Sequence, residues 1–148
     1  MTTDNEFKVA FVIIEDANRV VAGGKAHRWD VLKWGVAINL AVPAAMIATK
    51  ADYSARCLYF LFAVAVAVVG IVLIFHYSRR MTGARKHAAK AYEYLQKNGI
   101  PLAAMTASAE EYTKPVGCFY DTEELVLFPI VLLLSCIPSL IIAKALTL

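Results

Sequence analysis

The 148-residue sequence lacks the short motifs that mark enzyme active sites. It contains no HExxH, CxxC or GxSxG motif, no phosphate-binding loop and no dinucleotide fingerprint. Its carboxylates at Glu110 and Glu111 and at residues 121–124 are accounted for by helix capping. We therefore expect no catalytic residue, no cofactor and no metal, and the chain is predicted not to be an enzyme.

Cysteine, histidine and net charge are also scarce. The cysteines at positions 57, 118 and 136 are odd in number and widely spaced, so they match neither a disulfide framework nor a metal site. This predicts three free thiols. His76 and His87 are too far apart along one helix, about 16 Å, to share a metal ion. A net charge of +3, with bases and acids interspersed, gives no support to a nucleic-acid partner.

Hydrophobic residues are the class that the chain has in excess. They make up 59% of the sequence, and the mean hydropathy is +0.57. Most of them lie in three apolar runs, at residues 34–49, 57–77 and 125–143. The second run alone would form about 31 Å of helix, the thickness of a bilayer core. These runs predict an all-α integral membrane protein with three transmembrane helices and a small cytoplasmic helical layer.

The predicted chain has four parts. They are an N-terminal cytoplasmic amphipathic helix (1–30), a transmembrane helical hairpin (31–77), a basic cytoplasmic helix and loop (78–123) and a C-terminal transmembrane helix (124–148). The Gly23-Gly24 pair is expected to break the first helix before the membrane. The second membrane helix is expected to continue past Ser78 and to end at Asn98-Gly99.

The predicted basic helix carries an apolar stripe that needs a partner. Its members recur at three- and four-residue spacing: Met81, Ala84, Ala88, Ala91, Tyr92 and Leu95. We expect the segment EFKVAFVIIEDANRVV to cover this stripe. Basic residues near the helix ends predict that the N-terminus and the long connection are cytoplasmic and that the C-terminus is outside.

Small residues recur every fourth position in all three apolar runs. They are Ala37, Ala41, Ala45, Ala63, Ala67, Gly70, Ser135, Ser139 and Ala143. Small side chains let helix backbones approach closely, which favours packing within a subunit, between subunits, or both. The alternative is that Ala is simply common in membrane helices. The packing interpretation predicts a homo-oligomer surrounded by membrane lipids.

Asn39 is a strongly polar side chain within a predicted span, and it lies near Pro43. It is expected either to satisfy a carbonyl freed by the proline or to line a pore. Pro138 is expected to kink the third membrane helix.

A basic cluster follows the second span and comprises Arg79, Arg80, Arg85, Lys86 and Lys90. It has two interpretations. The first is that it sets the topology and attracts anionic lipid headgroups. The second is that it forms a charged vestibule or docks a protein partner or an anionic ligand.

The order of a short helix, a tight membrane hairpin and a basic helix resembles the SLATT group of bacterial two-transmembrane effectors. The hairpin reads WDVLKWGVAINLAVPAAMIATKADYSARCLYFLFAVAVAVVGIVLIF and the basic helix HYSRRMTGARKHAAKAYEYLQKNG, and the likeness covers roughly residues 5–99. The third apolar run departs from the two-helix pattern. The resemblance implies a protein that assembles in, and damages, the cell's own membrane in antiviral defence. The alternatives are a non-catalytic accessory or scaffold subunit, and an immunity protein against a membrane-acting toxin.

Overall fold

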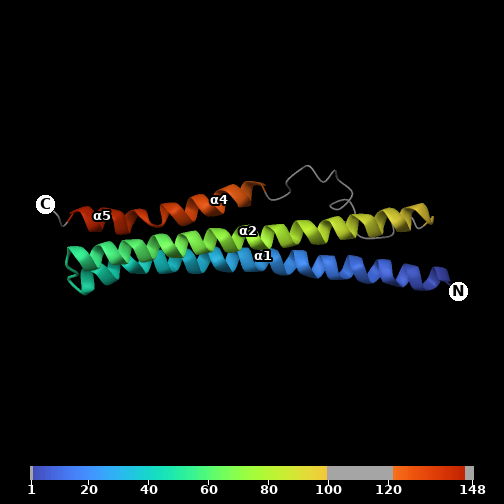
Figure 1. Ribbon diagram of the computed structural model, residues 1–148, viewed down its shortest axis with the longest axis horizontal. Helices are drawn as coiled ribbons and strands as arrows, with labels where there is room; N and C mark the ends of the chain where they lie inside the picture. Colours follow the sequence, from blue (N-terminus) through green and yellow to red (C-terminus); the bar gives the residue numbers. More distant parts are fainter. Residues whose placement is uncertain (1, 100–121, 146–148) are drawn as a thin grey trace. The chain divides into compact units, whose positions relative to one another are not determined.

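The computed structural model describes residues 2–99 and 122–145, and these residues form four helices. Helix α1 spans Thr2–Ala48, α2 spans Tyr53–Lys97, α4 spans Thr122–Leu134 and α5 spans Ile137–Ala145 (Figure 1). Three helical stretches are long and apolar enough to cross a membrane, within α1, within α2 and across residues 126–144. The predicted all-α chain with three helices able to span a membrane is confirmed.

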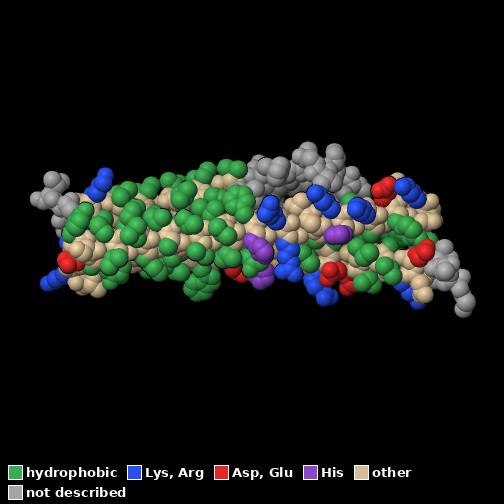
Figure 2. Space-filling model, in the orientation of Figure 1, with side chains coloured by type: hydrophobic (Ala, Val, Ile, Leu, Met, Phe, Trp, Pro, Cys, Tyr) green, Lys and Arg blue, Asp and Glu red, His purple; other side chains and the backbone are tan. Residues whose placement is uncertain are grey.

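Helices α1 and α2 are much longer than a bilayer is thick. They contain 47 and 45 residues, or about 70 Å each, against a hydrocarbon core of about 30 Å. The described residues divide into two compact units, which we call unit 1 (residues 2–26 and 77–99) and unit 2 (residues 27–76 and 122–145). Hydrophobic side chains cover most of unit 2, whereas charged side chains gather mainly over unit 1 (Figure 2).

In unit 1, the two ends of the hairpin pack against each other. Ala10, Ile14 and Ala17 of α1 form one core with Ala88, Ala91, Tyr92 and Leu95 of α2. The spacing of three and four residues on both helices is that of left-handed helix pairs. The expectation that the N-terminal segment covers the apolar stripe is therefore confirmed.

Helix α1 runs through Gly23 and Gly24 without interruption, so the predicted break at this pair is wrong. A glycine inside a helix costs only about 1 kcal/mol relative to alanine, and packing can outweigh that cost. At Gly24 an added Cβ would lie 2.5 Å from Cγ of Met81, whereas at Gly23 nothing lies within 4 Å. The missing side chain at Gly24 is what lets α1 approach α2 in unit 1.

The burial pattern of α1 changes once along its length. On either side, buried positions alternate at spacings of three and four, but Gly24, Arg28 and Leu32 follow one another at spacings of four and four. Such an insertion into a heptad pattern locally unwinds a helix pair. It brings Arg28 into the buried stripe, where its side chain is fully buried.

In unit 2, α4 and α5 pack against the hairpin. One core joins residues of α1, α2 and α4 with Cys136: Leu32, Val42, Met46, Ala63, Ala67, Ile74, Phe128, Leu132 and Cys136. Ile142 of α5 packs against this core. The hairpin turn is short. Lys50 takes a left-handed backbone conformation (φ 47°), and Asp52 caps α2 by accepting a 2.8 Å hydrogen bond from the Ala55 amide.

At its other end α2 stops at Lys97, and Gly99 follows in the left-handed conformation (φ 80°). A glycine just past the last turn is a common helix terminator because the left-handed conformation costs it nothing. The predicted continuation of the second membrane helix and its end at Asn98-Gly99 are confirmed.

The two adjacent glycines of α1 give a matched test of this packing. Gly23→Ala should raise the free energy of unfolding by about 0.5–1 kcal/mol, because the helix gains rigidity without a clash. Gly24→Ala should lose that gain, because Met81 must move aside. Unfolding in mixed micelles by titration with sodium dodecyl sulfate measures both variants. Equal stabilisation by both would contradict a close contact at Gly24.

Candidate functional site in the membrane-spanning unit

The third apolar run is broken in the middle. Helix α4 ends at Leu134 and α5 begins at Ile137, with Ser135 and Cys136 in the turn between them. Pro138 explains the break, because it has no amide hydrogen to donate to the carbonyl of Leu134 and its ring would clash there. Pro138, the predicted kink position, lies in the first turn of α5, after this two-residue interruption.

Asn39 of α1 reaches into this break. Its Nδ2 donates hydrogen bonds to Oγ of Ser135 at 2.9 Å and to Sγ of Cys136 at 3.4 Å. The Ser135 hydroxyl donates in turn to the Leu132 carbonyl at 2.6 Å. Since that hydroxyl hydrogen is already used, Ser135 can only accept from Asn39, which fixes the orientation of the amide.

The resulting polar cluster is buried and uncharged. Asn39 and Ser139 are fully buried, and Ser135 and Cys136 are nearly so. Among the described residues, Oδ1 of Asn39 and Oγ of Ser139 have no hydrogen-bond partner. The cluster contains no carboxylate or base, and the described part of the chain holds no group of His, Cys, Asp and Glu suited to a metal. It forms a polar contact between α1 and the break in the third span.

Just before the break, Leu132 fills a gap made by two glycines. An added Cβ at Gly35 of α1 would lie 2.6 Å from Cδ2 of Leu132, and one at Gly70 of α2 would lie 3.0 Å from Cδ1. Leu132 is fully buried. One turn earlier, Phe128 meets Trp29 edge-on, with ring centroids 4.8 Å apart. These contacts place the polar cluster at a fixed height along α1 and α2.

The predicted small-residue positions divide into two groups. Ala63, Ala67, Gly70, Ser135 and Ser139 are buried inside unit 2, and Ala143 is half-buried. By contrast, Ala37 and Ala41 are exposed and Ala45 is half-buried. The predicted small residues of α2, of α5 and of the turn before α5 therefore pack within the subunit, whereas those of α1 face outward.

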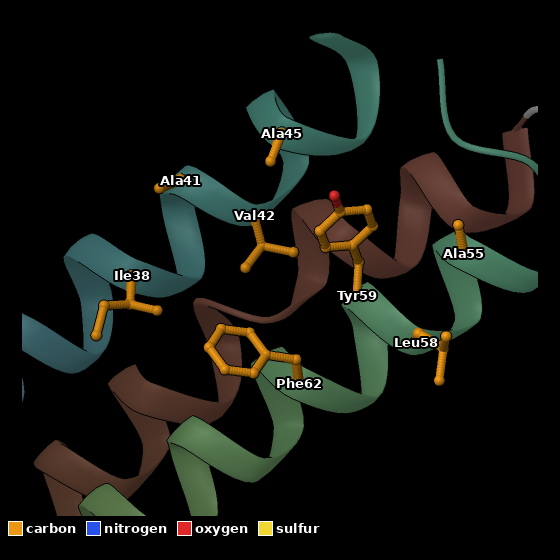
Figure 3. Close-up of a pocket in the computed structure, with 8 residues that line it drawn as sticks. All are labelled: Ile38, Ala41, Val42, Ala45, Ala55, Leu58, Tyr59 and Phe62. Atoms are coloured by element: carbon orange, nitrogen blue, oxygen red, sulfur yellow. The ribbon is translucent and has the colours of Figure 1, made fainter. Parts of the chain in front are cut away.

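An open apolar groove lies beside this outward stripe. Its volume is about 640 Å³, and its wall is formed by Ile38, Ala41, Val42, Ala45, Ala55, Leu58, Tyr59 and Phe62. Val42 points from α1 toward the rings of Tyr59 and Phe62 on α2 (Figure 3). We call this surface the membrane groove. Without charged groups in its wall, it suits an apolar helix or a lipid chain.

The remaining predicted residues lie apart from the cluster and the groove. Pro43 is buried within α1, which continues through it. Arg85 is half-buried on α2, while the other members of the basic cluster are exposed: Arg79, Arg80, Lys86 and Lys90. Cys57 and Cys136 are free thiols, and Cys118 lies outside the described residues.

The partners of Asn39 and the role of Gly35 were missed by sequence reasoning. Asn39 was expected to serve a freed carbonyl or a pore, but its amide binds the break in the third span, nearly 100 residues away. The available signal was the Ser135-Cys136 pair, which only Ile137 separates from Pro138, because a proline-broken helix needs polar groups nearby. Gly35 gave no signal beyond its position inside an apolar run.

No protein-family model matches this chain, and neither does any curated protein or solved structure. The function proposed below therefore rests on the geometry of the chain itself.

The hydrogen-bond pattern predicts that Asn39 adds little to stability. Asn39→Leu removes an interhelical contact worth about 0.6–1.7 kcal/mol, but it also removes the unpartnered Oδ1 and leaves Ser135 bonded to Leu132. We expect the free energy of unfolding to fall by less than about 1 kcal/mol in Asn39→Leu. In Asn39→Asp it should fall by several kcal/mol, because this substitution buries a charge. Detergent titration tests both, and a large loss in Asn39→Leu would show that the amide holds the break together.

The stability of unit 2 should depend on the side-chain volume at Gly35 and at Leu132, because the two residues are in contact. Gly35→Leu should destabilise unit 2 by about 1–3 kcal/mol through overpacking, and Leu132→Ala by about 2–5 kcal/mol through a cavity. The double variant should be more stable than the sum of the two losses predicts, because the new side chain occupies the vacated space. A double-mutant cycle measures this coupling, and strict additivity would contradict direct contact.

Proposed function

We propose that the protein is a small oligomeric membrane effector or pore-forming component of a bacterial inner membrane, acting in defence. Its membrane helices assemble with those of further copies, and the assembly perturbs the bilayer. The membrane groove carries this proposal, because it offers a neighbouring helix small residues and an apolar wall in a single place.

The low burial of the spanning helices supports assembly. Only 33%, 22% and 28% of the most apolar windows of the three candidate spans are buried inside the chain. The exposed remainder includes aromatic and branched side chains of α2 beside the groove, such as Leu58 and Phe62. In lipid, close van der Waals contact between helices is the main driving force for association, and small residues provide it.

Assembly is also what a pore would require. In the described part of the chain Asn39 is fully buried beside the core of unit 2, so it lines no open path within one copy. A conducting path would therefore lie between copies, lined by residues that are exposed in a single chain.

The charge distribution supports the proposed topology. Unit 1 contains most of the charged side chains, which are costly in a hydrocarbon core, so we place it in the cytoplasm as the predicted helical layer. The exposed basic residues Arg79 and Arg80 directly follow the apolar part of α2 and would contact anionic headgroups. The N-terminus is then cytoplasmic and the C-terminus outside.

The same groove supports a second candidate function. A helix from a different protein would find the same small residues and apolar wall. In that case the chain is a non-catalytic accessory or scaffold subunit, or an immunity protein that binds a toxin within the membrane.

Two alanines on α1 provide a matched test. Ala41→Leu fills the membrane groove and should reduce the oligomer, measured by native mass spectrometry of extracted membranes, and abolish depolarisation of expressing cells. Ala44→Leu makes the same change at an exposed position outside the groove and should leave both unchanged. A wild-type oligomer in Ala41→Leu would overturn the proposal, and co-purification of a different protein would favour the second candidate.

A further inference from the structure

Unit 1 has a second open surface, formed by α1 and α2 side by side. It has a volume of about 590 Å³ and is lined by Asn5, Glu6, Val9, Ala10, Ile13, His87, Lys90, Ala91 and Tyr94. We call it the unit 1 groove. Its floor is apolar, and its two edges carry different charges, Glu6 on α1 and Lys90 on α2.

This groove leaves apolar side chains uncovered in a highly charged part of the chain. Val9 is 58% exposed and Ile13 is 38% exposed, and the adjacent Val12 is 63% exposed. In the lipid-facing unit such exposure needs no explanation, but in water a contiguous apolar patch of this kind marks an interaction site. One edge of the groove is already ordered, because the Tyr94 hydroxyl donates a 2.5 Å hydrogen bond to Glu6 and Phe7 packs on the Tyr94 ring.

We propose that the unit 1 groove binds α1 of a second copy of this chain. This inference rests on the self-assembly proposed above and adds a separate contact outside the membrane. Two copies in one membrane have the same topology, so their first helices run parallel and present the same residues at the same height. A two-fold axis between them places each first helix in the groove of the other, with Val9 and Ile13 meeting their counterparts.

Charge complementarity selects α1 of the partner as the occupant. Along unit 1, the four acidic and three basic residues of α1 give it a net charge of −1, whereas α2 carries six basic residues and one acidic residue from Arg79 to Lys97. Two basic second helices would repel each other if they met directly. A nearly neutral first helix lying between them keeps the two basic helices apart, and it brings Lys90 close to the partner's Glu6 across the interface.

Cysteine cross-linking in native membranes tests this arrangement in the full chain. Val9→Cys and Ile13→Cys should each form a disulfide-linked dimer on mild oxidation, above the background of the wild-type cysteines. Phe11→Cys is the control, because Phe11 is also exposed but does not line the groove. Absence of dimer at positions 9 and 13, or equal dimer at position 11, would overturn the inference.

Two other products of the cross-linking reaction would also contradict the proposed contact between copies. A bond within one chain to Cys118 would show that the chain's own segment covers the groove, and a bond to a different protein would identify a heterologous partner. Native mass spectrometry of the same membranes separates the two proposals. A homo-oligomer without cross-linking at positions 9 and 13 would agree with the proposed self-assembly but contradict the contact in the unit 1 groove. A monomer would contradict both proposals.

Two matched charge-reversing substitutions on α2 test the contribution of Lys90 to the proposed contact. Lys90→Glu in the Ile13→Cys background should lower the rate of dimer formation about two- to fivefold, the range expected for an exposed ion pair. Lys86→Glu makes the same charge change at an exposed position outside the groove and should have a smaller effect. Equal effects of both would contradict contact between Lys90 and the partner.

Discussion

Close approach between helices is the constraint on which this structure depends, and it is met by positions with almost no side chain. Gly24 accommodates Met81 in unit 1, and Gly35 and Gly70 accommodate Leu132 in unit 2. Within a bilayer, lipid is as apolar as leucine, so burial alone gives helices little reason to associate. The gain comes from dispersion contacts, and these require surfaces that interlock. The position of the third span against the hairpin follows from where these gaps lie.

The polar cluster has a different part in this arrangement. A proline-broken helix in lipid exposes backbone groups that cannot bond to water, so nearby side chains must supply polar atoms. Ser135 and Cys136 supply them to the Leu132 carbonyl. Asn39 bonds to these two side chains, so the whole cluster can form only when α1 and the break lie at the same height. Hydrogen bonding thus selects the register, while the contacts around Leu132 provide most of the attraction. This division explains why a buried amide can matter to specificity and contribute little to stability.

Much of the fold could be predicted from local patterns, and the exceptions share one physical origin. Length and apolarity predict the three helices able to span a membrane, and Gly99 predicts the end of α2. Residue spacing predicts the stripe that Ala10 and Ile14 cover. The continuity of α1 through Gly23-Gly24 and the partners of Asn39 depend on contacts with distant segments, which no local window contains. The small-residue pattern is the clearest case, because Ala67 and Ala41 have similar surroundings in the sequence, yet one is buried and the other faces outward.

The interruption between α4 and α5 also affects how the protein responds to its bilayer. A continuous helix that is too long for the local hydrocarbon thickness adapts mainly by tilting. The third span consists of two short rods joined at Ser135-Cys136, so each rod can tilt separately and the span can shorten without moving as a whole. The uninterrupted helices of the hairpin have no such freedom. A change in membrane thickness would therefore strain α1 and α2 first, and it would act on the surface that carries the membrane groove.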